Sequence, residues 1–536
     1  MKKALSLILT AAMVLLLLAG CGGSAVSTAD GSAGTGDTAP GTAAAPAVAG
    51  DDAPAEMEGS RVFRFGVEAE FTSMSPLVGG QVGYSTAFAN GIYEPLFDMN
   101  ENNEITGRLA KSYEWKDDNT LILTLQEGVK FHNGSDFTAE DVLFSLKLYY
   151  DTPQYTSRLQ WIDFENSKAD GDYTVELKTT SYSAVLVSNL TSELMMMLDK
   201  DWYEAAGGSI DQDANGTGPY KLKAWNMGSD LEIVRNEEYW GGADSYYDEI
   251  QIVFYNDPTT AVLEYDTGRL DAVYVQNSTD IEALLNGGFQ NTWCAQAGTH
   301  TISGLCMSSA VGDTFQNPLL REAICYAIPV EELVNGVSNG IVVPQDSVIP
   351  SSDPAHKDVG YYEYDPDKAA QLVEQYKSET GVTDVVLTMV NVSSTLHDDL
   401  AEAIQAYLAK VGITMQIESG QPSDIIPRYI AGEVNFCLNQ SGGGADPADV
   451  FMSMERGGNP AATIPSDEVL DILDEAKVTK DWNERLDLYG KVQQMVHDEY
   501  LFLPLFERQT YYAVRDGITF DFGVGHYPKC TSFGAA

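Results

Sequence analysis

The stretch from residue 22 to residue 60 contains no lysine, no arginine and no aromatic residue. It consists mainly of Gly, Ala, Ser, Thr and Pro, and such a composition buries too little apolar surface to offset the entropy lost on ordering. Any folded body is therefore confined to residues 61–536. We interpret residues 21–60 as a disordered tether and expect a first strand at Val62-Phe63-Arg64-Phe65.

The N-terminus has the pattern of a secretory signal peptide over residues 1–20. Two lysines precede an apolar run over 4–20, which ends in Leu18-Ala19-Gly20-Cys21. A cysteine after small residues resembles a bacterial lipobox, which implies that Cys21 is lipidated and becomes the mature N-terminus. An uncleaved membrane anchor is the alternative, although the run is at the lower length limit for a spanning helix. We expect an extracytoplasmic protein, anchored by Cys21 to the outer face of the cell membrane.

The chain is strongly acidic. Its 536 residues include 31 Lys+Arg and 79 Asp+Glu, a formal net charge of −48. Nucleic acid is excluded as a partner, because binding a polyphosphate needs clustered cations that release counterions. Removing the two lysines and six acids of the first 60 residues leaves −44 on the body, so the acidity does not belong to the tether. The length predicts two to three globular domains.

Strand and helix patterns interleave along the body, which predicts an α/β fold. Alternating or apolar segments predict strands at 120–125, 173–178 and 385–390. Residues 138–141 resemble a capping box, and the helix that follows is expected to run through Val142, Leu143, Leu146 and Tyr150. A second helix should end at Gly412 and bury one face formed by Leu400, Ile404, Leu408 and Val411.

Two motifs come close to known catalytic or metal sites. Residues 336–340 match G-x-S-x-G around Ser338, but a nucleophile elbow has its strand before the serine and its helix after it. Here we expect a helix before and an extended segment after, so a secreted serine hydrolase is the less favoured function. Asp211, Asp213 and Asn215 begin like a calcium loop, yet Leu222 stands where a bidentate carboxylate is required. We predict no catalytic residue, no metal site and no cofactor.

Five cysteines lie in the body, and no C-x-x-C motif occurs among them. An odd number leaves at least one thiol unpaired, and their spacing does not select a pairing. A disulfide, which suits the expected compartment, and small buried thiols both remain open. The cysteines are Cys294, Cys306, Cys325, Cys437 and Cys530.

Six blocks in a fixed order carry a family resemblance. They are 109–115 with 125–142, 216–240, 265–271, 320–328, 399–417 and 504–506. Together they resemble the extracellular solute-binding proteins, family 5, the peptide/nickel class of receptors for ATP-binding-cassette (ABC) importers. The resemblance implies a two-lobed clamp like the type II periplasmic binding proteins, with an extra domain inserted in the first lobe.

The resemblance also implies domain boundaries. Lobe I would comprise 61–97, 213–297 and 507–536, the extra domain 98–212, and lobe II 298–506. The chain would cross between the lobes near Gly298-Thr299-His300 and near Leu503-Pro504.

The implied function is that of a non-enzymatic receptor. Such a monomeric lipoprotein captures peptides, here oligopeptides, between its lobes and delivers them to the permease and ATPase subunits of an ABC importer. A receptor of the same fold for nickel, a metallophore or another small solute is the alternative.

The resemblance further implies candidate ligand-binding residues. Peptide receptors of this family use an Asp of lobe II for the ligand's ammonium group; Asp446 fits that position if two residues are deleted, and Gly443 falls there without a gap. Dipeptide binders place an Arg where this chain has Asn391 and its neighbours. Both this departure and the absence of the usual neighbouring Trp favour a longer peptide held mainly by its backbone.

Three further residues complete the candidate set, namely Gly444, Asn439 and Tyr84. The glycine run that includes Gly443 and Gly444 either allows a ligand to approach the backbone closely or is a plain loop.

Overall fold

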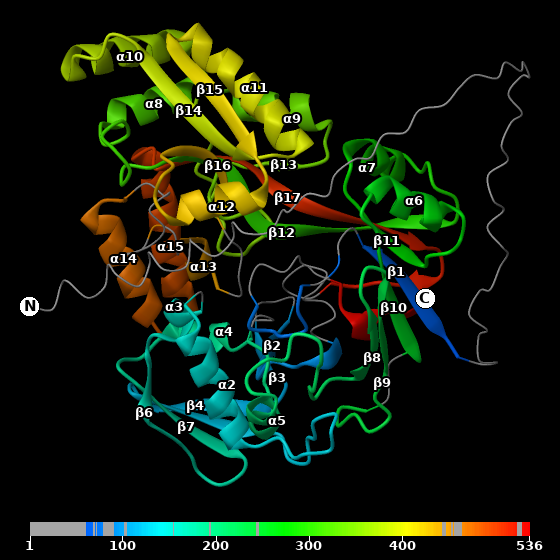
Figure 1. Cartoon of the computed structure of the whole chain (residues 1–536). Helices are drawn as coiled ribbons and strands as arrows, with labels where there is room; N and C mark the ends of the chain where they lie inside the picture. The colour runs from blue at the N-terminus through cyan, green and yellow to red at the C-terminus, as the bar shows by residue number, and fades with distance from the viewer. Residues whose placement is uncertain are drawn as a thin grey trace, which may run out of the picture. The chain divides into compact units, whose positions relative to one another are not determined.

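The structure is a computed structural model (Figure 1), which describes residues 60–67, 70, 72–78, 91–100, 104–153, 155–191, 195–242, 246–441, 446–451, 454, 464–522 and 528–536. The signal peptide, Cys21 and the tether up to residue 59 lie outside these residues. Within them, no helix combines the length and the apolar character needed to cross a membrane.

The strands are β1 (Val62–Val67), β2 (Phe97–Met99), β3 (Ile105–Gly107), β4 (Ala110–Asp117), β5 (Thr120–Leu125), β6 (Ile162–Ala169), β7 (Thr174–Thr179), β8 (Tyr220–Asn226), β9 (Asp230–Arg235), β10 (Glu249–Phe254), β11 (Ala272–Val275), β12 (Thr292–Met307), β13 (Val343–Pro344), β14 (Val385–Val392), β15 (Ile413–Gly420), β16 (Phe436–Ser441), β17 (Phe502–Arg515), β18 (Ile518–Thr519) and β19 (Gly534–Ala535). The helices are α2 (Ala139–Asp151), α3 (Thr156–Leu159), α4 (Ala184–Asn189), α5 (Lys200–Ala205), α6 (Pro258–Asp266), α7 (Ser278–Leu285), α8 (Pro318–Ala327), α9 (Val330–Ser338), α10 (Pro366–Thr380), α11 (Thr395–Lys410), α12 (Pro422–Ile430), α13 (Ala448–Phe451), α14 (Asp467–Val478), α15 (Trp482–Asp498) and the 3-10 helix η2 (Cys530–Ser532).

Two long antiparallel strands, β12 and β17, run through the centre of the main sheet (Figure 1). The strand order is β15-β14-β16-β12-β17-β11-β1-β10-β9-β8, with β13 paired to β17. Strands β14–β16 therefore extend the ladder on one side and β1 with β8–β11 on the other. The β12–β17 register shifts between Gly298 and Ile302 and between Ser303 and Gly304, within the stretch where we expect the chain to cross between the lobes. The domain boundaries themselves remain predictions.

The first strand packs against the end of the chain. Alternation in β1 places Phe63 and Phe65 in the core, where neither is exposed. The Phe63 ring lies 4.4 Å from that of Phe533, and the Phe65 ring lies 5.9 Å from that of Tyr512, measured between centroids. Aromatic pairs at such distances add to the stabilisation from area burial. This packing joins residues from both ends of the body in one core.

The extra domain is built on the four-stranded sheet β4-β5-β7-β6 and α2. The predicted capping box is confirmed: Thr138 is the N-cap of α2, and its backbone N–H donates to the Asp141 carboxylate at 2.9 Å. The predicted helix is confirmed, since α2 contains Val142, Leu143, Leu146 and Tyr150. Helix α2 buries Val142, Leu146 and Tyr149, whereas Leu143 and Tyr150 are only half-buried, because spacings of four and three follow one face of a 3.6-residue helix.

Helices α8 to α11 share one hydrophobic core with strands β14–β16 in lobe II. The predicted face of α11 is confirmed, since Leu400, Ile404, Leu408 and Val411 are all buried in one core. Helix α11 ends at Lys410, and Gly412 follows with φ of +86°, a left-handed conformation that glycine adopts without steric cost. The interleaved helices and strands confirm the α/β class.

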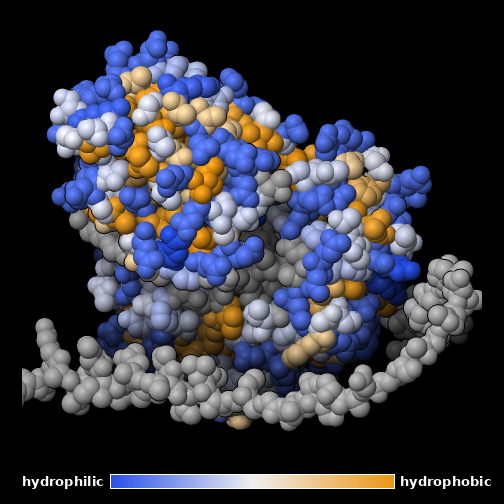
Figure 2. All heavy atoms as spheres, turned by 45° about the horizontal axis from the view of Figure 1, so that its top comes forward, coloured by the Kyte–Doolittle hydropathy of each residue, from blue (hydrophilic) through white to orange (hydrophobic). Residues whose placement is uncertain are grey.

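The surface of the described residues is rich in acids. Glu331 and Glu332 in the first turn of α9, and Asp367 in that of α10, are exposed, where the helix dipole favours negative charge. Hydrophilic side chains spread over the face in Figure 2, with apolar residues between them. The negative charge of the body is therefore carried in part by exposed helix starts.

The G-x-S-x-G segment is the end of a helix, as predicted. Ser338 is the last residue of α9 and is buried, Asn339 follows in the left-handed region with φ of +51°, and β13 comes after it. The order helix-turn-strand is the reverse of a nucleophile elbow.

The family-like blocks fold into buried polar networks. Glu94 is fully buried and accepts hydrogen bonds from Arg108, Thr217, Tyr239 and Trp240 at 2.7–2.8 Å. The His132 ring donates from Nε2 to the Gly218 carbonyl oxygen, 2.9 Å away, and its Nδ1 is buried without a partner. These groups connect the extra domain to the 216–240 block, so we assign them a structural role.

Because His132 is buried, the free energy of unfolding should fall in mild acid. Burial lowers its pKa to about 4, below the value of about 6.5 in an unfolded chain. Between these values the unfolded chain binds the proton and the folded protein does not, so acidification from pH 6.5 to 4 should lower the free energy of unfolding by about 2–3 kcal/mol. His132→Gln keeps an N–H donor for Gly218 and should remove that part of the slope. Urea unfolding across this pH range tests it: the two pH profiles should run parallel above about pH 7.5 and converge in acid, and parallel profiles throughout would contradict the assignment.

Candidate functional site

Asn391 lies at the carboxyl end of β14, in register with Ser419 of β15. Its side chain is fully buried; Nδ2 donates to Asp398 at 3.3 Å, and Oδ1 has no hydrogen-bond partner. Asp398, near the start of α11, also accepts from the hydroxyls of Ser393 and Ser419 at 2.7 Å each. The Asp398 carboxylate holds the Asn391 side chain in place, and the buried Oδ1 of Asn391 remains an acceptor without a donor. An unpaired buried acceptor costs about 1–3 kcal/mol, so a donor that reaches it would bind favourably.

Asn439 lies at the carboxyl end of the neighbouring strand β16. Strands β14 and β16 are parallel, with Val390 opposite Cys437, so Asn391 and Asn439 are at the same edge of the sheet. Ligands of open α/β sheets bind at the carboxyl ends of the strands. The structure therefore brings these two predicted residues to one edge. Because side chains alternate along a strand, Asn391 lies on the face of Met389 and Asn439 on the opposite face, with Cys437.

Strand β16 also pairs with the crossing strand β12, where Asn439 is opposite Gly304. A Cβ on Gly304 would lie 2.4 Å from the Leu503 carbonyl oxygen and 2.5 Å from the Phe502 ring. Only glycine fits there, because β12 and β17 approach each other too closely for a side chain. The sheet edge that carries Asn439 is thereby fixed to the ladder between the lobes.

Tyr84, Gly443 and Gly444 lie outside the described residues, and their roles remain predictions.

Asp446 already has a cation as its partner. Nη2 of Arg485, on α15, lies 2.7 Å from both carboxylate oxygens, and the Tyr489 hydroxyl donates to the same carboxylate at 3.1 Å. Both side chains of the pair are buried, with 1% of Asp446 and 5% of Arg485 exposed. A ligand's ammonium group would have to compete with this guanidinium, so the expected ammonium site remains a prediction that the contacts do not favour.

A second pair, between the half-buried Arg158 and the buried Asp449, joins the extra domain to lobe II. Nη1 of Arg158, on α3, lies 3.2 Å from Oδ1 of Asp449, while Oδ2 of Asp449 has no hydrogen-bond partner. Burial raises the pKa of Asp449. Ser188 of α4 donates to Asp446 at 3.3 Å. The turn 446–449 is thus held by lobe II and by the extra domain together.

A small cavity of about 30 Å³ lies beside this turn. It has room for about one water. The residues that line it come from the extra domain and from lobe II. They are Ser157, Arg158, Gln160, Trp161, Val185, Asn189, Ala448, Asp449 and Lys477.

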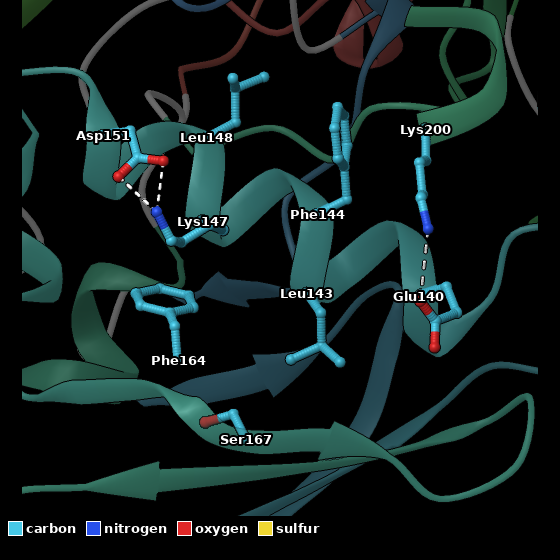
Figure 3. A pocket seen from close by; sticks show the side chains of 9 residues that line it. All are labelled: Glu140, Leu143, Phe144, Lys147, Leu148, Asp151, Phe164, Ser167 and Lys200. Carbon is cyan, nitrogen blue, oxygen red and sulfur yellow. Dashed lines mark hydrogen bonds and ion pairs between the residues drawn. The ribbon is translucent and has the colours of Figure 1, made fainter. Parts of the chain in front are cut away.

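A larger hollow, of about 340 Å³, lies on the extra domain between α2 and β6 (Figure 3). Leu143, Phe144 and Phe164 line it, and Lys147 pairs with Asp151 at its rim. Lys200 pairs with Glu140 at 3.5 Å, so the lysines and acids of the lining balance. None of the candidate ligand-binding residues lines this hollow.

Sequence reasoning missed Arg485, Arg158 and Asp449. One signal was available for Arg485: it lies one turn before Tyr489 on the buried side of α15, and an arginine among apolar positions of a helix needs a partner. The identity of that partner depends on how the distant segment around Asp446 packs. No local sequence pattern identifies that partner.

Arg485→Gln should destabilise the protein strongly. Removing one partner of a buried ion pair costs about 3–5 kcal/mol, because the other charge stays buried. The control is Arg428→Gln, since Arg428 pairs with Glu418 at the surface and such pairs contribute about 1 kcal/mol or less. Urea unfolding measures both variants. Equal midpoints for Arg485→Gln and Arg428→Gln would show that the buried pair contributes nothing.

Comparison with known proteins agrees with the architecture. Glutathione-binding protein GsiB of Escherichia coli (strain K12) is 24% identical over 467 residues, covering 82% of this chain and 87% of that protein. The structure of the ABC transporter-associated periplasmic binding protein DppA from Helicobacter pylori, in complex with peptide STSA, matches with a TM-score of 0.76 at 24% identity, covering 88% of this chain and 98% of that one. The dipeptide binding protein from Pseudoalteromonas sp. SM9913, in complex with Met-Leu, matches with a TM-score of 0.77 at 20% identity, covering 89% and 100%.

These structural matches confirm the two-lobed clamp. The family model of the bacterial extracellular solute-binding proteins, family 5 (middle region), matches residues 104–462, which span most of the body. The chain therefore belongs to the bacterial extracellular solute-binding proteins, family 5, a family of non-enzymatic transport receptors that work outside the cytoplasm.

Proposed function

We propose that this chain is the substrate-binding lipoprotein of an ABC importer, and that it captures oligopeptides between its lobes and passes them to a membrane permease. Family membership supports the role of transport receptor for peptides or related solutes. Three similar proteins bind glutathione, the peptide STSA and Met-Leu, which supports the peptide class. In this proposal the receptor acts as a monomer, and the importer's ATPase supplies the energy.

The observation that carries the proposal is the amide of Asn391 at the carboxyl edge of the sheet, whose buried Oδ1 has no hydrogen-bond partner. Asn391 lies near the end of β14, and Asn439 lies near the end of the neighbouring strand β16 on the opposite face of the sheet. An amide offers both a donor and an acceptor. These are the complements of peptide N–H and C=O groups. Recognition through amides suits a ligand that is held along its backbone.

The charged termini of the ligand should contribute less to binding than its backbone amides. The Asp446 carboxylate is bonded to Arg485, and this chain has Asn391 and its neighbours where dipeptide binders of the family place an arginine. We therefore propose that Asp446 positions the segment that carries Gly443 and Gly444. In this proposal that segment, with Tyr84, contacts the ligand's backbone.

Peptide binding tests the proposal. The full chain is titrated calorimetrically with a dipeptide, a tetrapeptide and a nonapeptide of neutral side chains, each free and N-acetylated. We expect the longer peptides to bind and acetylation to weaken them by less than about tenfold. A loss beyond about a hundredfold would instead place the ligand's ammonium group at a carboxylate, for which Asp446 is the candidate. Binding of nickel–histidine in place of every peptide would support the alternative receptor class.

Variants locate the site. Asn391→Ala and Asn439→Ala should each weaken peptide binding by up to about tenfold, the effect of one hydrogen bond. Asn166→Ala is the control, because Asn166 is bonded to Asp163 on the extra domain. If all three variants bind alike, the ligand does not contact this sheet edge.

Lipid anchoring is tested at Cys21. In cells that make the full chain, Cys21→Ser should move the protein from the membrane fraction to the soluble extracytoplasmic fraction, because no diacylated cysteine then holds it. Mass spectrometry of the wild-type N-terminal peptide should show the lipid on Cys21. An unmodified Cys21 in membrane-bound protein would contradict lipidation and favour an uncleaved anchor.

A further inference from the structure

Cys306 and Cys437 face each other inside lobe II. They are directly opposite on the adjacent antiparallel strands β12 and β16, and both side chains are buried in the same core. Opposite residues on such strands have Cα atoms about 4.5 or 5.5 Å apart. Disulfides bridge Cα separations of about 4.4–6.8 Å, so these two cysteines can be joined without moving the backbone.

The other described cysteines have no such neighbour. Cys294 is opposite Ala513 in the β12–β17 ladder, Cys325 lies on α8, and Cys530 lies on η2. Among the residues that the structure describes, the ladder thus places only Cys306 and Cys437 opposite each other.

We propose that Cys306 and Cys437 form a disulfide in the mature extracytoplasmic protein. Disulfides persist in oxidising compartments outside the cytoplasm, which is where this family works. The oxidant is a disulfide compound of the thiol-exchange class. One cysteine thiolate attacks its sulfur and releases a thiol, and the second thiolate displaces the remaining half as another thiol. Two protein thiols become one disulfide, the oxidant is reduced to two thiols, and the two protons go to the thiols released.

Burial decides when this bond forms. In the folded protein Cys437 is fully buried and Cys306 is 6% exposed, so exchange takes place while β12 and β16 are assembling. The hydrogen bond with Cys306, and then burial, raise the pKa of the Cys437 thiol well above its usual value. Two thiols that fold before oxidation are therefore unreactive, and a disulfide formed first is protected from reductants.

The cross-link would act on the candidate site. Cys437 precedes Asn439 on β16 by two residues, and β12 is one of the two strands of the central ladder. The bond closes the chain between residues 306 and 437 into a loop, which removes entropy from the unfolded state. It would fix the register of the strand that presents Asn439.

Peptide mapping tests the bond. The full chain is secreted from cells, purified without reductant, unfolded in an alkylating agent and digested with trypsin. Cys294 and Cys306 share one tryptic peptide, since no Lys or Arg lies between Arg269 and Arg321, so the Cys294→Ala variant is used. We expect the peptide of Cys306 linked to that of Cys437, two hydrogens lighter than the sum of the reduced peptides, and alkylated Cys325 and Cys530. Alkylated Cys306 and Cys437 would overturn the proposal.

Thermal unfolding with and without dithiothreitol gives an independent readout. The reductant, present from the start of a refolding step, should lower the unfolding temperature of the wild type by about 2–4 °C or more. It should leave the Cys306→Ala/Cys437→Ala double variant unchanged. Cys325→Ala is the control for loss of a buried thiol and should still respond to the reductant. A wild type that does not respond would overturn the cross-link.

Discussion

The pairing of β12 with β17 is the constraint on which the rest of the structure depends. This ladder runs from Thr292 opposite Arg515 to Cys306 opposite Phe502. Strand β11 joins the lobe I strands to β17, and strand β16 joins the lobe II strands to β12. The close approach at Gly304, where a Cβ would meet the Leu503 carbonyl oxygen, keeps both strands in one sheet. A bend in this ladder would therefore move one group of strands relative to the other, which is the kind of hinge that lets a ligand stabilise one arrangement of two lobes.

Ion pairs with buried carboxylates are the second constraint on the structure. A body with so many acids has few cations, and two of its arginines are placed in the interior or at an internal interface: Arg485 with Asp446, and Arg158 with Asp449. Each carboxylate is buried, and a buried charge needs a partner to persist. These pairs hold one turn of lobe II between α15 and the extra domain. The carboxylate that the family resemblance assigns to a ligand's ammonium group, Asp446, is thus paired with Arg485 inside the protein.

Much of the fold could be predicted because its signals are local. The capping box at Thr138, the apolar face from Leu400 to Val411 and the aromatic alternation of β1 each depend on a few neighbouring residues, and each was found as expected. The helix through Val142, Leu143, Leu146 and Tyr150 was also found as expected, but two adjacent tyrosines allow two helical phases, and the sequence did not decide between them. Tertiary packing buried Tyr149 and left Tyr150 half-buried. The reversed order around Ser338 was also predictable, because helix and strand patterns flank it directly.

The sequence by itself determined the α/β class, the family resemblance and the reversed order of helix and strand around Ser338, because local periodicity and motif order encode these features. Only the tertiary structure decided three features: the partners of Asp446 and Asp449, which polar groups are buried, and the position of Cys306 opposite Cys437. Those contacts join residues that are far apart along the chain, such as Ser188 and Asp446. Their geometry is set by strand register and helix packing, which no single segment of the sequence contains.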